Sequence, residues 1–237
     1  MKVELPKLLK YLKSASVNWE IDPFRLEFKD RIRFGQLDPT HSILSFGEIS
    51  PTLFKGYTEV GTITFSKQAY TQLKDRFKVD EEVDIDFSDG KLKVEGKLEK
   101  FIINMINVEA KEIPVLEETP YGYILPKIKE KPMKTFKLDI KELDIGGVSE
   151  VVRIKFADNL VVQSGDDEEG TYTKTLRISQ AIGDGKGETA LHGSIYSSIQ
   201  DIFEGECWIT LADQAPICIF KKDQFISLSV IYAPWVG

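Results

Sequence analysis

This sequence of 237 residues is poor in the side chains that most enzymes use for catalysis or metal binding. It has two histidines, His41 and His192, and two cysteines, Cys207 and Cys218. GxSxG, HExxH and CxxC motifs are absent, and the carboxylates form no recognisable pair. General acid–base, nucleophilic and metal chemistry all need such groups to converge. We therefore predict no catalytic residue, no metal site and no cofactor, and keep an enzyme only as the rival hypothesis.

Long apolar runs are also missing. No stretch approaches the ~20 apolar residues of a membrane-spanning helix, and the N-terminal MKVELPKLL has no signal-peptide core. We expect no membrane contact. Cys207 and Cys218 are interpreted as two buried thiols of a cytosolic protein, and a disulfide in an oxidising compartment is the alternative.

What the sequence does have is enough apolar surface for ordinary cores, at 42% apolar and 11% aromatic residues. Its net charge is −7, but residues 1–107 hold 17 basic and 17 acidic side chains, so the whole excess lies in the second half. An acidic total argues against a surface that coats nucleic acid nonspecifically. It is compatible with lysines gathered on one face.

One unit of the sequence occurs twice, 126 residues apart. Its first copy is Ser66–Phe87, where apolar residues at helical spacing are followed by alternating apolar residues typical of a half-buried strand. The residues that recur are Tyr70, Leu73, Phe77, Val83 and Ile85, which return as Tyr196, Ile199, Phe203, Ile209 and Leu211. Helix and strand in phase at one offset favour a duplicated domain.

Two predicted helices of the first half carry lysines opposite their apolar face. The helix over Pro6–Ala15 shows Lys7, Lys10 and Lys13, and the helix that starts at the N-cap Ser66 shows Lys67, Lys74 and Lys78. Solvated helix faces and a shared basic surface both explain these lysines.

The remaining chain reads as short strands, with one proline-bearing connection in the middle. Expected strands include Val17–Ile21, Arg25–Phe28, Arg31–Leu37, Ser42–Ile49 and Tyr57–Phe65 before the connection, and Met133–Ile140, Val151–Phe156, Thr171–Ile178 and Phe225–Tyr232 after it. The connection, Glu109–Pro132, holds four prolines and many apolar residues, so we expect it to lie against its own domain and help form a groove. We predict an α+β protein with an N-terminal domain over 1–108, a connecting loop over 109–132 and a C-terminal domain over 133–237.

Three short segments stand out besides the duplicated unit: Leu37-Asp38-Pro39-Thr40-His41 before a predicted strand, Val108–Val115 in the connection, and Tyr232-Ala233-Pro234 near the end of the sequence. Together with the duplicated unit, these segments resemble the DNA sliding clamps of the proliferating cell nuclear antigen family. The resemblance implies two tandem clamp domains with helices on one face and antiparallel sheets on the other. It further implies a ring of three such chains around duplex DNA, bound without sequence preference, with edge strands near Lys91–Glu95 and Thr171–Ile178 joining the chains.

The same resemblance implies two sets of site residues. The residues expected to face DNA are Lys7, Lys10, Lys13, Lys67, Lys74, Lys78 and Lys141. The residues expected to form a groove for short peptides of a DNA polymerase, clamp loader, nuclease or ligase are His41, Leu44, Ile113, Pro114, Val115, Tyr232, Ala233, Pro234 and Trp235. It places the protein in the cytoplasm with the nucleoid, or in the nucleus of a eukaryote.

The sequence also departs from the family pattern. Ser42 replaces a valine, Trp235 replaces a basic residue, the connection is longer, and the first helix of the second half shrinks to Lys141–Gly147. Four alternatives therefore stay open: a subunit of a heterotrimer, a viral or plasmid-borne clamp, a checkpoint-type clamp, and a two-domain binding protein with no DNA role.

Overall fold

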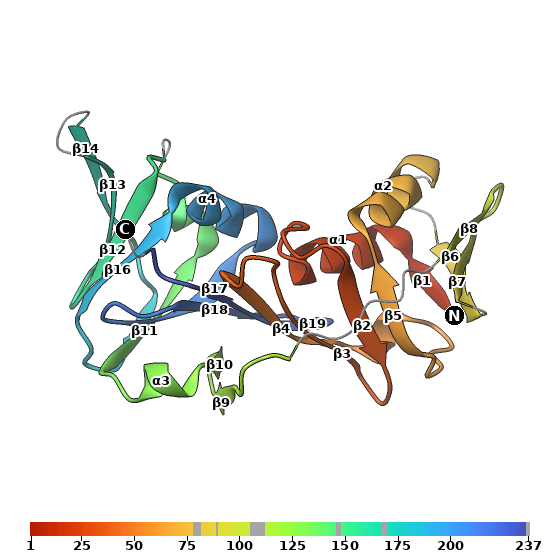
Figure 1. The fold of residues 1–237 in the computed structure, drawn as a ribbon, viewed down its shortest axis with the longest axis horizontal. Coiled ribbons are helices and arrows are strands. Elements are labelled where there is room, and N and C mark those ends of the chain that lie inside the picture. The colour runs from red at the N-terminus through yellow and green to blue at the C-terminus, as the bar shows by residue number, and fades with distance from the viewer. Residues whose placement is uncertain (78–81, 89, 105–111, 146–147, 167–169, 236–237) are drawn as a thin grey trace.

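The chain folds into antiparallel β-sheets with its main helices along one side (Figure 1). This computed structural model describes residues 1–77, 82–88, 90–104, 112–145, 148–166 and 170–235. Helices α1, α2 and α4 lie on the upper side of the sheets in Figure 1, and the connecting segment with α3 runs along the lower side. We call these the helix side and the outer side. In the described residues, no helix is long and apolar enough to cross a membrane.

The first half alternates strands with two amphipathic helices and one short 3-10 turn. Its elements are β1 (Lys2–Glu4), α1 (Leu5–Ala15), β2 (Phe24–Phe28), β3 (Ile32–Leu37), β4 (Ile43–Ile49), η1 (Pro51–Leu53), β5 (Gly61–Phe65), α2 (Lys67–Arg76), β6 (Glu82–Ser88), β7 (Lys91–Glu95) and β8 (Lys100–Asn104). Leucines at helical spacing bury one face of α1, as the sequence predicted.

The second half has the same order, with a 3-10 turn in place of the first helix and one additional short strand, β15. Its elements are β11 (Met133–Asp139), η2 (Ile140–Leu143), β12 (Val151–Phe156), β13 (Leu160–Asp166), β14 (Gly170–Thr175), β15 (Gln180–Ile182), β16 (Gly187–His192), α4 (Gly193–Ile202), β17 (Glu206–Ala212), β18 (Ile217–Lys222) and β19 (Ile226–Tyr232).

The strand order confirms the duplication. The sheet β1-β6-β7-β8 of the first half returns as β11-β17-β18-β19, and β5-β2-β3-β4 returns as β16-β12-β13-β14. Within the chain, β19 pairs with β4 from Ile226↔Ile49 to Tyr232↔Ile43, so that one sheet from each half merges into a single nine-stranded sheet.

The two repeated helices end in the same way. Phe77 and Phe203 are extended C-cap residues, and their N–H groups donate to the carbonyls of Leu73 and Ile199 at 3.2 and 3.3 Å. Ser66 caps the N-terminus of α2 by accepting from the Ala69 N–H at 3.1 Å, as predicted.

The connecting segment lies against the folded chain, and its hairpin packs mainly on strands β18 and β19 of the second half. It contains the hairpin β9 (Glu117–Thr119) and β10 (Gly122–Ile124), followed by α3 (Pro126–Lys129). The Tyr123 N–H donates to the Ser229 hydroxyl at 3.0 Å, and the Tyr121 ring packs on Trp208 at 4.6 Å. The hairpin therefore covers the outer side of the sheet near the joint between the halves.

Two strand expectations are wrong. Residues 17–21 form a turn, because Val17, Asn18 and Trp19 have positive φ and the backbone N–H groups of Asn18 and Ile21 bond back to carbonyls of the α1 end. Lys91–Glu95 is not a sheet edge, since β7 lies between β6 and β8. The edge is β8, whereas β14 is an edge strand as expected.

A large core lies between the helices and the sheets, and a smaller one lies on the outer side. The two cysteines are free and buried in different cores, Cys207 in the large one and Cys218 in the small one. The buried-thiol interpretation is therefore confirmed. Burial raises the pKa of each thiol to about 12.

Candidate functional site

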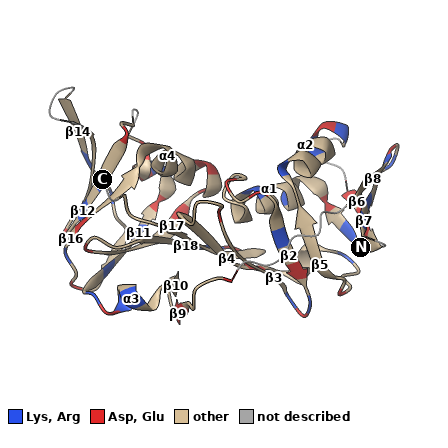
Figure 2. Cartoon of the chain, in the orientation of Figure 1, with Lys and Arg blue, Asp and Glu red and all other residues tan. Residues whose placement is uncertain are grey.

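The helix side carries most of the lysines that the sequence singled out. Lys7 and Lys10 are exposed on α1, and Lys13 is half-buried on the same helix. Lys67 and Lys74 are exposed on α2 (Figure 2). Lys141 is exposed on η2, and Lys78 lies outside the described residues.

On α1, ion pairs with acidic neighbours neutralise part of this positive charge. Lys7 pairs with Glu4 at 2.8 Å, and Lys10 pairs with Glu204 at 2.6 Å. The hydrogen bond from Lys10 holds the pKa of Glu204 below its usual value. In the described residues, Lys67 and Lys74 of α2 form no ion pair. Lys13 and Lys141 form none either, but α2 is the helix on which two of the named lysines are both exposed and without an ion pair in the described residues.

Helix α4 contributes no basic residue to this side. It exposes Ser194, Ser197 and Asp201, and Glu204 follows its last turn. Since α4 packs against α1, the helix side changes from basic at α2 to acidic at the end of α4 (Figure 2). This gradient agrees with the charge difference between the two halves of the sequence.

The outer side carries an apolar groove of about 620 Å³. It lies beside the small core, between the turn after β3, the connecting segment, the start of α3 and the end of β19. Its lining residues are Leu37, His41, Ser42, Leu44, Pro114, Val115, Leu125, Pro126, Lys127, Pro216, Ile231 and Ala233. Val115 is largely exposed, at 79%, so this apolar wall faces open space. Such a surface is typical of an interaction site.

A buried aspartate holds the rim of the groove. Asp38 accepts hydrogen bonds from the N–H groups of Thr40 at 2.9 Å and Ile43 at 2.6 Å, and from the Thr40 hydroxyl. Burial alone raises the pKa of this carboxyl, but the hydrogen bonds from Thr40 and Ile43 outweigh it and lower the pKa. The turn that results gives His41 a positive φ of 59° and places it on the groove.

The structure brings five of the nine predicted groove residues together: His41, Leu44, Pro114, Val115 and Ala233. Ile113 lies on the other side of the connecting segment, against Gly35. Tyr232 is fully buried in the large core. Pro234 is half-buried and does not line the groove. Trp235 lies apart from it, because its backbone N–H donates to the Ala190 carbonyl at 2.8 Å and its ring centroid lies 5.2 Å from that of His192.

Ile231 lines the groove and was missed at the sequence level. The signal was present, because Ser227 and Ser229 alternate with the buried Leu228 and Val230 and so mark the outer face of β19. Continuing that alternation places Ile231 outward, where it pairs with Leu44 across the strands. Lys127 and Pro216 had no comparable signal, since distant segments bring them to the groove.

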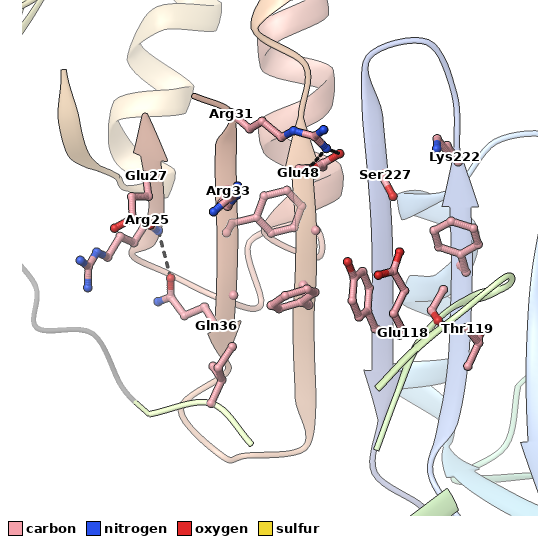
Figure 3. Close-up of a pocket in the computed structure, with 18 of the residues that line it drawn as sticks. Arg25, Glu27, Arg31, Arg33, Gln36, Glu48, Glu118, Thr119, Lys222 and Ser227 are labelled. Carbon is pink, nitrogen blue, oxygen red and sulfur yellow. Dashed lines mark hydrogen bonds and ion pairs between the residues drawn. The ribbon is translucent and has the colours of Figure 1, made fainter. Parts of the chain in front are cut away.

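A second cavity, of about 890 Å³, lies on the outer side between strands β2–β4 and the β9–β10 hairpin. Figure 3 shows residues that line it. Its charges are mixed: Arg31 pairs with Glu48 at 2.8 Å, and Glu118 reaches in from the hairpin. Burial, with Glu118 and Glu48 nearby, raises the pKa of Tyr123. Ile113 lines this cavity whereas Pro114 lines the groove, so the connecting segment separates the two.

Comparison of the sequence with family profiles and with curated proteins finds no match. Solved structures do match, over the whole chain. PCNA from A. fulgidus, bound to the C-terminal region of FEN-1, has a TM-score of 0.78 at 15% identity and covers 100% of this chain and 98% of its own. PCNA from Entamoeba histolytica has a TM-score of 0.79 at 16% identity, covering 99% and 98%. This chain has the PCNA fold.

A third structure, the PCNA2–PCNA3 complex from Sulfolobus tokodaii, matches with a TM-score of 0.72 at 18% identity, covering 98% of both chains. The predicted fold class is thus confirmed: α+β, with two similar clamp units in tandem. Within the PCNA fold of this chain, β8 and β14 occupy the places that β19 and β4 occupy at the internal joint. In the described part of the chain, β8 and β14 each have one edge that no other strand pairs with.

Proposed function

We propose that this protein is a DNA sliding clamp, a scaffold without catalytic activity of its own. Three copies form a ring around duplex DNA, and the outer groove holds replication or repair enzymes. The observation that carries the proposal is the repeated strand order, which among the described strands leaves one edge of β8 and one edge of β14 unpaired, in opposite halves of the chain.

The pairing of β4 with β19, which joins the two halves of the chain and is called the internal joint, serves as the template for the joint between chains. Strands β4 and β19 pair over seven residues each, and β14 and β8 are their counterparts in the opposite halves. Pairing β8 of one chain with β14 of the next repeats the internal arrangement. Such a head-to-tail contact closes into a ring when the rotation from one chain to the next is a whole fraction of a full turn. With three chains of two similar units each, the ring has six units.

The proposed units are residues 1–108 and 133–237, with 109–132 as the connection on the outer side. A sister chain with the same edges is the alternative neighbour, as in the PCNA2–PCNA3 complex of Sulfolobus tokodaii. Each ring then presents α1, α2 and α4 toward its centre. The exposed Lys67 and Lys74, with Lys7, Lys10, Lys13, Lys78 and Lys141, are the proposed contacts to phosphates. Lysines contact phosphates without reading bases, which suits a protein that slides.

The groove is the proposed docking site for partner peptides. Its volume and its apolar lining suit a few anchoring side chains, and it borders the connecting segment as the sequence resemblance implied. The matched A. fulgidus PCNA binds the C-terminal region of FEN-1. We propose that polymerases, clamp loaders, nucleases or ligases present comparable segments to this chain.

Cross-linking across the proposed joint tests the ring. Ile102 of β8 and Tyr172 of β14 are each 50% exposed, and the native cysteines are buried. The double variant Ile102→Cys/Tyr172→Cys, treated with a flexible bis-maleimide, should give a covalent trimer that stays on nicked circular plasmid in detergent and leaves it after linearisation. Either single-cysteine variant should stop at a dimer or monomer and serves as the control. Cross-linked species that release circular and linear DNA equally would refute the encircling function.

A further inference from the structure

Lys127 is the one lysine or arginine that lines the groove in the described part of the chain. Its neighbours in the groove are apolar or neutral, with Leu125 and Pro126 beside it on the same segment. An ammonium group on an apolar wall interacts more strongly with an opposite charge than one surrounded by water.

The fold holds the backbone of Lys127 in place at the groove. Pro126 begins α3 at a position that suits proline, and Ile128 is 1% exposed in the small core. The residues on either side of Lys127 are therefore anchored, while its own side chain extends from an exposed position.

Neighbouring lysines are engaged and Lys127 is not. Lys129 pairs with Glu117 at 2.6 Å, and the Lys131 ammonium donates to the Asp213 carbonyl at 2.7 Å. In the described residues, Lys127 has no ion-pair partner. Among the carboxylates nearby, Glu117 pairs with Lys129 and Asp38 accepts the hydrogen bonds of the turn at the groove rim. Glu130, three residues along the chain, is exposed and forms no ion pair in the described residues.

We propose that Lys127 selects partner segments that carry a carboxylate next to their apolar anchors. This inference rests on the proposed docking function of the groove and adds a charge preference to it. The apolar wall gives affinity for the anchors, and the unpaired ammonium favours an acidic neighbour and disfavours a basic one. The ammonium and the carboxylate meet at the groove edge, so salt should weaken the preference.

The test uses synthetic fluorescent peptides with one aliphatic and two aromatic anchors, flanked on either side by Glu, Gln or Lys. Fluorescence anisotropy with the full-length protein should rank affinities Glu above Gln above Lys, with about fivefold or more between the extremes at low salt. Lys127→Glu should reverse this order. Lys186→Glu, which makes the same charge change at an exposed residue outside the groove lining, should keep it.

A second variant separates this inference from the groove itself. Val115→Asp adds a charge to the exposed apolar wall and should weaken all the peptides, because it disrupts anchor binding without touching a core. If Val115→Asp weakens every peptide but Lys127→Glu leaves their order unchanged, the charge preference is wrong and the groove stands. If no peptide responds to Val115→Asp, the docking function is wrong.

Discussion

The ammonium of Lys10 on α1 lies 2.6 Å from the carboxylate of Glu204, which follows α4 in the other half of the chain. Beside it, the Ser14 hydroxyl donates to the Ile202 carbonyl at 3.0 Å. These contacts join the halves on the helix side, opposite the β9–β10 hairpin. They also withhold one lysine from the surface proposed to face DNA.

Removing the charge of Glu204 should therefore strengthen DNA binding. In Glu204→Gln, Lys10 becomes available to a phosphate, so the salt dependence of binding to a short duplex should steepen by up to about one unit. Both side chains are exposed, so the thermal midpoint should change little. Glu117→Gln removes an equivalent ion-paired charge on the outer side and should leave the salt slope unchanged. An unchanged slope in Glu204→Gln would place Lys10 away from DNA.

Charge reversal on α2 should have the larger and opposite effect. Lys67→Glu/Lys74→Glu changes two unpaired lysines, so duplex affinity should fall more than tenfold at low salt. The control, Arg25→Glu/Lys222→Glu, makes the same net change in the outer-side cavity and should bind DNA nearly as the natural protein does. Equal losses in both variants would indicate that only net charge matters and that α2 is not the DNA-facing surface.

The hairpin on the outer side should depend on Gly122. Its φ is +101°, and an added Cβ would lie 2.6 Å from the Phe220 ring. Gly122→Ala should therefore lower the free energy of unfolding by about 1–3 kcal/mol, measured by urea denaturation. Gly56→Ala is the matched control, since Gly56 also has positive φ, at +68°, but has nothing within 4 Å of an added Cβ. The loss in free energy of unfolding in Gly122→Ala beyond that in Gly56→Ala measures the contact between the hairpin and the sheet. Equal losses in the two variants would contradict a close contact at Gly122.

The Asp38 turn predicts a pH dependence of stability. The pKa of Asp38 is lower in the folded chain than in the unfolded one, so its carboxylate stabilises the fold above about pH 4 and loses this effect as pH falls through the folded pKa. Asp38→Asn should cost about 1–3 kcal/mol at pH 7, because charged hydrogen bonds within the rim are weakened. Urea denaturation of both proteins at pH 7, 5 and 3 should show a difference that shrinks only at pH 3. A constant difference would mean that the carboxylate charge is not what stabilises the turn.

Much of the fold could be predicted from local patterns in the sequence. The spacing of Tyr70, Leu73 and Phe77 and its return at Tyr196 identified the repeated unit, because burial on one helix face leaves a periodic trace. Residues 17–21 were misassigned because Val17, Trp19 and Ile21 alternate and are buried, as in a strand. Their backbone bonds instead return to the end of α1, which side-chain patterns do not reveal.

The candidate site was less predictable, because it is assembled from distant segments. His41 and Leu44 were placed by resemblance to a known segment, whereas Lys127 reaches the groove only because the hairpin and α3 fold back over the sheet. The pairing of Lys10 with Glu204 spans 194 residues and has no local trace. Counting charged residues in the sequence revealed that the second half is acidic and the first is neutral. Only the packing of α1 on α4 shows where lysines of the first half meet carboxylates of the second.

The joint between chains should be weaker than the joint within one. Inside the chain, α1 packs against α4 across the joint, supported by the pair Lys10–Glu204. Between chains, the corresponding partners are α2 and η2, and η2 has four residues where α1 has eleven. With less helix contact and no connecting hairpin, a ring held mainly by β8 and β14 should open and dissociate on dilution.

Sedimentation velocity over a wide concentration range tests the ring most directly. At high concentration the protein should sediment as a species of three times its 26.9 kDa mass, and it should shift toward one chain on dilution. Ile102→Pro removes an N–H from the edge strand β8 and should abolish the trimer, whereas a proline variant elsewhere on an exposed loop should not. A single-chain mass at every concentration, or a trimer that is indifferent to Ile102→Pro, would contradict the proposed closure through β8 and β14.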